Sequence, residues 1–154
     1  MGSWCEVLPR LRSLAGLPAD ERRLAFQALA TLAVVRLILW LFSFGRVRSI
    51  VDRWASTPAA VPDEMAARAV RRAVDRAARS IAGSACLPQA LTAEVMLRRS
   101  GQPARVSIGV APDGAPLDAH AWVESSGILV TGDSADLGRY RTLAVFGPES
   151  RSID

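Results

Sequence analysis

The sequence predicts an α+β fold in which helices come first and an antiparallel sheet follows. Up to about residue 81, apolar side chains recur at helical spacings of three and four. From Arg105 onward, short segments that alternate polar and apolar residues are separated by glycine- and proline-containing turns. The chain has 154 residues, of which 50% are hydrophobic, so it is long and apolar enough for one compact domain. This composition excludes a wholly disordered chain.

The charge, cysteine and histidine content argues against several kinds of binding site. The net charge of +4 is spread along the sequence, and we expect no nucleic-acid partner. Two cysteines, Cys5 and Cys86, cannot form a disulfide framework, and with the single histidine, His120, they cannot build a structural zinc site. The sequence contains no glycine-rich phosphate loop. We therefore expect no metal, nucleotide or other cofactor.

Residues 1–56 form the first part, a strongly apolar helical region. We expect Asp20 to cap a helix whose apolar run extends over Leu24–Phe44 and ends at Gly45. A second, short helix is predicted over Arg46–Ala55. Its apolar side is expected to contain Val47, Ile50, Val51 and Trp54.

The run Leu24–Phe44 is long enough to cross a membrane, because its 21 residues match a hydrocarbon core about 30 Å thick. Arg36 lies in the middle of the run, where a charged side chain costs roughly 2.5–3.5 kcal/mol. The favoured interpretation is a helix buried by the rest of the chain or by a partner; a membrane anchor is the alternative. Since residues 1–23 do not resemble a secretory signal, we expect a cytoplasmic protein, with peripheral contact to the inner face of the membrane as the alternative.

Residues 57–81 form the second part, a proline-containing linker and an amphipathic helix. Asp63 is expected to cap this helix. The arginine-rich side is interpreted as a solvated surface, and docking of an acidic peptide or partner is the alternative. The predicted buried side contains Ala66, Ala69, Val70, Ala73, Val74, Ala77 and Ile81.

Residues 82–154 form the third part, a helix followed by strands. The helix is predicted from Cys86 to Gly101, with Pro88 tolerated in the first turn and Gly101 as the residue that ends it. Strands are predicted over residues 105–110, 119–124, 128–130 and 140–146. The expected arrangement is one helix packed on an antiparallel sheet.

Cys86 and His120 are the residues of this third part with nucleophilic or acid–base chemistry. The free N–H groups and dipole at a helix start stabilise a thiolate, although many free cysteines are simply small buried side chains. His120, 34 residues later on a strand, is either a structural histidine or the base that such a thiolate needs. A base also needs a third group that orients its imidazole. Asp133 is the first candidate for that group, with Asp136 and Asp118 as alternatives.

Four short blocks of this part resemble a known family. They are Cys86–Ala90, Leu97–Gly101, Ile108–Val110 and His120–Glu124, which reads HAWVE. In this combination they resemble the lasso-peptide maturation proteases, which are transglutaminase-like cysteine proteases. The resemblance covers residues 82–146 closely and the apolar N-terminal region less specifically.

The resemblance implies a papain- or transglutaminase-like catalytic core over residues 82–154. It implies that Cys86 is the nucleophile, His120 the general base and acid, and Asp133 the orienting group, with Asp136 close behind. Such enzymes cut a ribosomally made precursor between its leader and its core, and a separate cyclase then closes the ring on the freed amine.

The resemblance also implies three partners. These are the precursor peptide, the lasso cyclase and a separate leader-recognition protein, which we expect to dock on residues 1–56. Two other functions fit the residues: a transglutaminase-like acyl transferase acting on another peptide, and a non-enzymatic, membrane-associated interaction module. Trp122 is interpreted as sheet packing or as a wall of the cleft. Glu124, on the same strand face as His120, is either a surface residue or a residue that contacts the catalytic side chains without touching the substrate.

Overall fold

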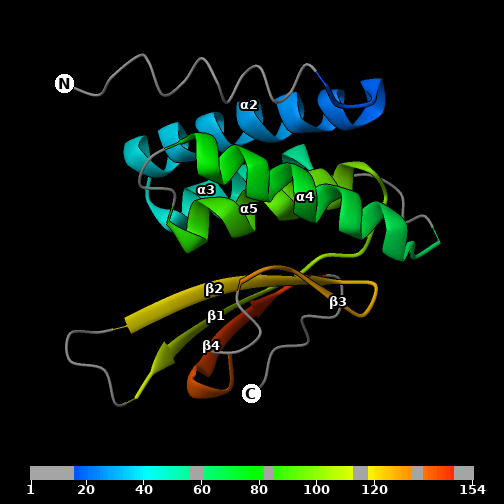
Figure 1. The fold of residues 1–154 in the computed structure, drawn as a ribbon. Helices are drawn as coiled ribbons and strands as arrows, with labels where there is room; N and C mark the ends of the chain where they lie inside the picture. The colour runs from blue at the N-terminus through cyan, green and yellow to red at the C-terminus, as the bar shows by residue number, and fades with distance from the viewer. Residues whose placement is uncertain (1–15, 56–60, 82–84, 113–117, 133–136, 148–154) are drawn as a thin grey trace.

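A layer of helices lies on one face of a four-stranded antiparallel sheet (Figure 1). The structure is a computed structural model that describes residues 16–55, 61–81, 85–112, 118–132 and 137–147. In these residues the helices precede all strands along the chain, which confirms the predicted α+β class. The helices are α2 (Ala19–Leu41), α3 (Phe44–Trp54), α4 (Glu64–Ser80) and α5 (Cys86–Arg99).

The sheet has the strand order β3-β2-β1-β4. Ser126 and Gly127 both have positive φ and form the tight turn between β2 and β3. A short 3-10 turn, Leu137–Arg139, precedes β4. The strands are β1 (Arg105–Ala111), β2 (Asp118–Ser125), β3 (Ile128–Thr131) and β4 (Arg141–Phe146).

The apolar run forms one long helix, α2, but both of its predicted ends are wrong. Pro18, not Asp20, is the N-cap, because the Pro18 carbonyl already accepts a hydrogen bond from the Arg22 N–H at 2.9 Å. At the other end the backbone becomes extended at Phe42, and Ser43 starts the next helix. Gly45 therefore lies in the first turn of α3 and does not end α2.

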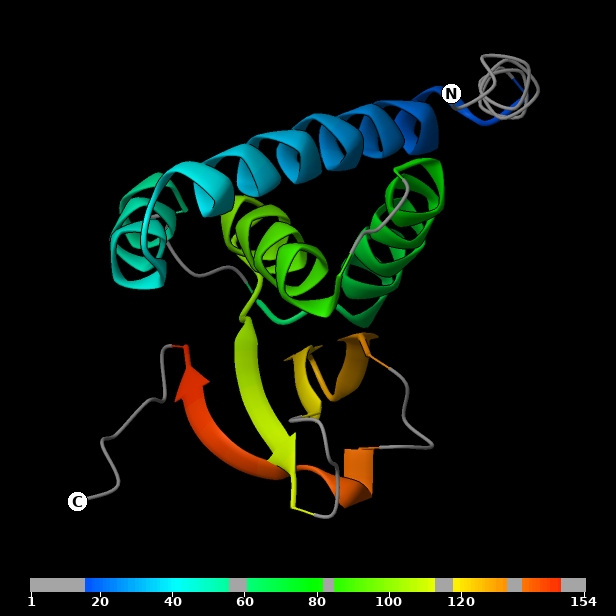
Figure 2. The ribbon, with the colours of Figure 1, turned by 90° about the vertical axis from the view of Figure 1, so that its left-hand side faces the viewer.

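α2 lies across the other helices, on the side away from the sheet (Figures 1 and 2). Its buried residues are Ala25, Ala28, Leu32 and Val35. Among the described helices, α2 is the one long and apolar enough to cross a membrane. Of its apolar 18-residue stretch, 22% is buried inside the protein. Core helices of soluble proteins, which are mostly buried, and signal sequences near an N-terminus pass the same test of length and composition.

α4 begins as predicted, because the Asp63 carboxylate accepts a hydrogen bond from the Met65 N–H at 2.8 Å. Its buried side is Ala67, Val70, Ala73, Val74 and Ala77. Ala66 and Ala69 were predicted on this side and are only half-buried, because Ala67 occupies the position that faces the core.

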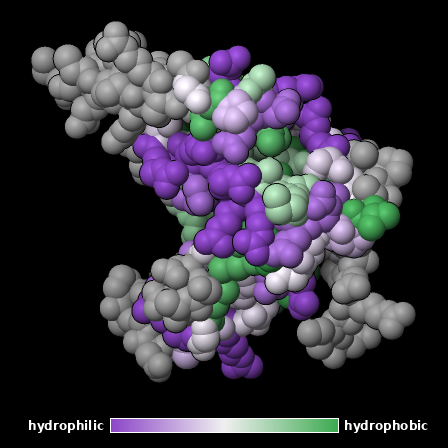
Figure 3. Space-filling model, turned by 45° about the vertical axis from the view of Figure 1, so that its right-hand side comes forward, coloured by the Kyte–Doolittle hydropathy of each residue, from purple (hydrophilic) through white to green (hydrophobic). Residues whose placement is uncertain are grey.

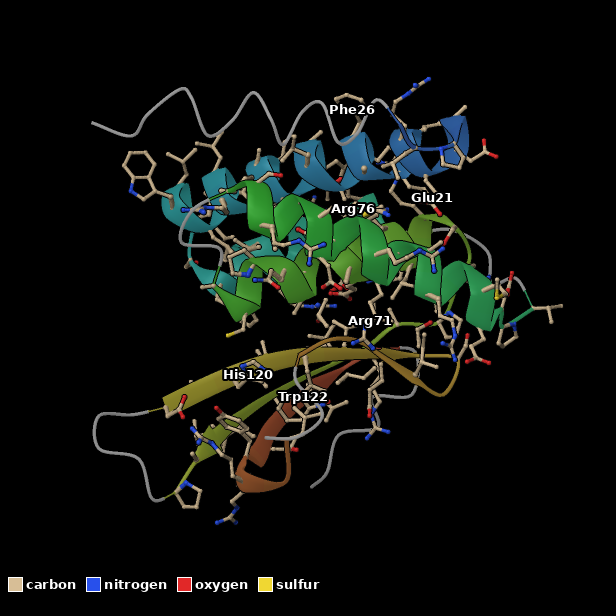
Figure 4. The ribbon with its side chains drawn as sticks, viewed as in Figure 1. Glu21, Phe26, Arg71, Arg76, His120 and Trp122 are labelled. Carbon is tan, nitrogen blue, oxygen red and sulfur yellow. The ribbon has the colours of Figure 1, made fainter. Side chains whose placement is uncertain are left out.

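Several arginines on the outer side of α4 bind within the protein. Arg72 and Arg76 lie 3.8 and 3.2 Å from the Glu21 carboxylate of α2, and Arg71 donates to the Leu129 carbonyl of β3 at 3.0 Å (Figure 4). Hydrophilic residues cover much of this side of the molecule (Figure 3). These contacts tie α4 to α2 and to the edge of the sheet.

α5 is the central helix, and its residues 90–97 are all buried. It ends at Arg99, and Gly101 follows the C-cap as predicted, where its φ of +77° lets the Gln102 N–H donate to the Leu97 carbonyl at 2.9 Å. One hydrophobic core joins α2, α4, α5 and the sheet. A second, smaller core joins α2, α3 and α5.

A fully buried carboxylate connects α3 to α5. Glu94 accepts hydrogen bonds from Arg48 at 2.5 and 2.7 Å and from Arg98 at 3.1 Å. Burial by itself lowers the pKa of the Arg48 guanidinium, but the hydrogen bonds and charges of Glu94 and Asp52 outweigh it and raise that pKa above its ordinary value. This ion-pair cluster fixes α3 against the helix that begins with Cys86.

Candidate active site

Cys86 is the first residue of α5, as the sequence predicts. The residue before it, Ala85, is the extended N-cap, and the first helical hydrogen bond runs from the Gln89 N–H to the Ala85 carbonyl at 3.4 Å. The Cys86 N–H therefore precedes the helical hydrogen-bond ladder, and Pro88 has no N–H to compete with it. Cys86 itself is a half-buried free thiol. A partly accessible thiol beside an unused donor can act as a nucleophile and bind an oxyanion.

The structure places Cys86 beside the strand that carries His120. Its Sγ lies 3.9 Å from the carbonyl oxygen of Ala119, a distance that fits a weak S–H···O hydrogen bond. Ala119 directly precedes His120 in β2, and α5 packs on this strand. Packing thus brings the Cys86 thiol, 34 residues away in sequence, to the helix-facing side of the β2 backbone, one position from His120.

His120 lies on the face of β2 that points away from the helices. Ala121 and Val123 pack into the helix-facing core, and His120, Trp122 and Glu124 alternate with them. The imidazole is half-buried and contacts two aromatic rings, of which Trp122 is labelled near it in Figure 4. Its centroid lies 6.3 Å from the Trp122 ring and 5.1 Å from the Tyr140 ring, both nearly parallel to it.

Two glycines let the backbone approach these rings. A Cβ built on Gly109 would lie 3.2 Å from two indole carbons of Trp122 and 2.9 Å from the Arg141 carbonyl oxygen. A Cβ built on Gly132 would lie 2.8 Å from the Trp122 Cβ and 3.4 Å from Nε2 of His120, and Gly132 also has a φ of +104°. Trp122 is 7% exposed and packs on this backbone, which favours its interpretation as packing. The end of β3 therefore lies against Nε2 of the histidine.

Of the three carboxylates that could orient His120, the structure describes that of Asp118. Asp133 and Asp136 lie outside the described residues, although Asp133 directly follows Gly132. The Asp118 carboxylate accepts hydrogen bonds from Arg139 and, at 3.2 Å, from the Tyr140 hydroxyl. The hydrogen bond to Asp118 raises the pKa of the Arg139 guanidinium. Asp118 thus holds the turn before β4, and with it the Tyr140 ring, against His120.

Sequence reasoning missed the contacts of Tyr140, Gly109 and Gly132. Tyr140 is the only tyrosine in the chain, but it is 20 residues from His120, and its proximity depends on strand order. Gly109 is opposite His120 in the register between β1 and β2, a pairing that the sequence pattern alone does not specify. In the part of the chain that the structure describes, no group of three or more His, Cys, Asp or Glu residues could hold a metal ion.

Comparison with protein families gives a match over most of the chain. A family model described as the transglutaminase-like superfamily matches residues 30–145, a span that runs from the middle of α2 to the end of β4 and includes both Cys86 and His120. Neither a curated protein nor a solved structure matches the chain.

Proposed function

Since the chain belongs to the transglutaminase-like superfamily, we propose that it is a cysteine peptidase that removes the leader peptide from a lasso-peptide precursor. The superfamily includes both cysteine proteases and acyl transferases, and it supports a thiol-dependent acyl chemistry here. One observation carries the assignment of the nucleophile: the Cys86 thiol lies at the start of α5, against the residue that precedes His120. The precursor itself is inferred from the four sequence blocks that resemble the maturation proteases.

The His120 imidazole projects from the face of β2 opposite to Cys86, so it must turn around the edge of the strand to reach Sγ. In the first half of the reaction it then takes the proton of the Cys86 thiol. The thiolate then attacks the carbonyl carbon of the scissile peptide bond, forms a C–S bond and places negative charge on the carbonyl oxygen. The N–H of Cys86 donates to that oxygen, because it lies before the first helical hydrogen bond of α5. The imidazolium of His120 protonates the leaving amine as the C–N bond breaks. This step frees the N-terminus of the core peptide.

In the second half, water replaces the departed amine. His120 accepts a proton from the water, whose oxygen attacks the thioester that joins Cys86 to the leader. The C–S bond breaks, and the leader leaves with a new carboxylate. The proton returns to the Cys86 sulfur, so the enzyme is unchanged.

The contact between Gly132 and His120 supports Asp133 as the orienting residue. Nε2 of the imidazole faces the backbone of Gly132, which directly precedes Asp133. A carboxylate that accepts a hydrogen bond from Nε2–H leaves Nδ1 as the nitrogen that exchanges protons with Cys86. Asp118 is less suited to this task, because its carboxylate already binds Arg139 and Tyr140.

The partners of this reaction remain predictions. A leader-recognition protein would present the precursor and dock on residues 1–56, and the lasso cyclase would consume the freed amine. The outer side of α4 offers little for an acidic leader, because Arg72 and Arg76 bind Glu21 and Arg71 binds β3.

Cleavage in oxygen-18-labelled water tests the proposed reaction. The full chain is incubated with precursor and recognition protein, and the products are weighed by mass spectrometry. We expect two fragments, with one labelled oxygen in the new carboxylate of the leader. A leader joined to an amine would instead support an acyl transferase, and an unchanged precursor would contradict both activities.

A further inference from the structure

The outer face of α2 exposes large apolar side chains. Phe26, Leu37 and Trp40 expose 52%, 54% and 82% of their surface, although they belong to a helix whose opposite side is buried. This face points away from the other helices and from the sheet (Figures 1 and 2). An apolar stripe of this size on a soluble protein marks an interaction surface.

The spacing of the stripe is that of a coiled-coil seam. Phe26, Ala30, Ala33, Leu37 and Trp40 follow one another at intervals of four, three, four and three residues. All five are exposed, and Arg23, three residues before Phe26, continues the same line. We refer to these six residues as the α2 seam. Val34 and Leu41, which are 41% and 54% exposed, flank this line, and its spacing of four and three residues is that of a helix–helix contact.

We propose that the α2 seam binds the α2 seam of a second copy of this chain, with the two helices antiparallel. In such a pair the a position of one helix faces the d position of the other. Leu37 then faces Phe26 of the second copy, and Ala30 faces Ala33. The small alanines lie beside the two-fold axis and let the helices approach closely, and the large side chains fill the space on either side.

Charge complementarity favours this occupant. In the same register Arg23 faces Trp40 of the second copy, where its guanidinium can stack on the indole. α2 has no basic residue in its last turn, so the negative end of its dipole has no cation of its own. Arg22 and Arg23 of the second copy supply that charge. Because the pair is two-fold symmetric, each of these contacts is made twice.

The buried area fits a concentration-dependent dimer. Together Phe26, Leu37 and Trp40 expose roughly 400 Å² per copy, given the 150–250 Å² that an aromatic side chain can bury. The pair would cover about 800 Å² with these side chains, which is the size of a weak, transient interface. This inference does not depend on the proposed enzymatic activity.

Sedimentation equilibrium of the full chain tests the dimer. As the concentration rises from micromolar to hundreds of micromolar, the mass should increase from that of one chain, 16.5 kDa, toward twice that value. Leu37→Lys should stay monomeric throughout. The control Leu143→Lys changes a leucine that is 64% exposed on β4, and it should dimerise like the natural chain. A natural chain that stays monomeric, or two variants that behave alike, would overturn the proposal.

Disulfide trapping tests the antiparallel register. In a background with Cys5→Ser and Cys86→Ser, a mixture of Phe26→Cys and Leu37→Cys chains should cross-link efficiently, and either variant alone should cross-link little. Strong self-linking of Phe26→Cys would indicate parallel helices and overturn the register. A monomer that sediments with vesicles of anionic lipid would assign the α2 seam to a membrane, and one that binds only the leader-recognition protein would assign it to that protein; both results overturn the dimer.

Discussion

Replacing Glu94 with glutamine should destabilise the protein strongly without changing its shape. The carboxylate is fully buried and accepts three hydrogen bonds from Arg48 and Arg98. Glu94→Gln removes the negative charge and leaves the Arg48 guanidinium, 12% exposed, without its main counter-charge. Breaking a buried pair in this way costs about 3–5 kcal/mol. Because Asp52 still binds Arg48 at 2.8 Å, we expect the lower end of that range, about 3 kcal/mol.

Urea and thermal unfolding, followed by circular dichroism, measure this loss. A change of about 3 kcal/mol corresponds to a fall in Tm of roughly 6–12 °C for a chain of this length. The control Asp52→Asn removes an exposed member of the same cluster and should cost less than about 1 kcal/mol. The double variant Arg48→Met with Glu94→Leu should recover most of the stability, because neither charge is then left buried and unpaired. A Glu94→Gln protein within about 1 kcal/mol of the natural chain would refute this reasoning.

Three further variants test the surroundings of the site and the start of α4. Gly109→Ala should displace the Trp122 indole and lower kcat/KM for the precursor about 10- to 100-fold, whereas Gly45→Ala, with no atom near the added methyl, should leave cleavage unchanged. Tyr140→Leu should lower kcat/KM about 3- to 10-fold, because it removes the ring beside the catalytic histidine, and Tyr140→Phe should keep most of the rate; equal losses would contradict a role for the ring. Asp63→Ala should lower the free energy of unfolding by about 1 kcal/mol in urea titrations, and no loss would mean that the cap contributes nothing.

The order and type of the elements were predictable because their signals are local. The periodicity around Val70 and Val74 specifies a helix whatever it packs against, and the Asp63 cap needs only its own next two residues. Asp20 shows the limit of such reasoning. It precedes an apolar run just as Asp63 does, but the Pro18 carbonyl starts the helix earlier and places Asp20 inside the first turn.

Half of the candidate site was predictable for the same reason. The helix start at Cys86 and the strand around His120 follow from residue patterns, but the rings and glycines around the histidine follow from sheet register. The register shifts at Ile108/Gly109 and at Val123/Glu124, and no sequence pattern marks either bulge. Contacts that lie beyond a bulge as counted from the turn, such as that of Gly132 with His120, therefore need the folded sheet.

The buried Glu94 shows why polar core residues escape sequence analysis. A glutamate in a helix is ordinarily solvent-facing, and Glu94 is buried only because Arg48 and Arg98 enclose it. Arg48 is 46 residues away on another helix. The pairing depends on how α3 packs on α5, which the local pattern does not determine.

The initial rate of leader release tests the central claim, that Cys86 and His120 act together on one peptide bond. The natural chain, Cys86→Ala and His120→Ala are each incubated with precursor and recognition protein, with Cys5→Ala as the matched cysteine control. We expect Cys5→Ala to match the natural rate and the two site variants to lose on the order of 10³-fold or more in kcat, with both variants still folded. Equal cleavage by all four proteins would contradict the assignment of the site.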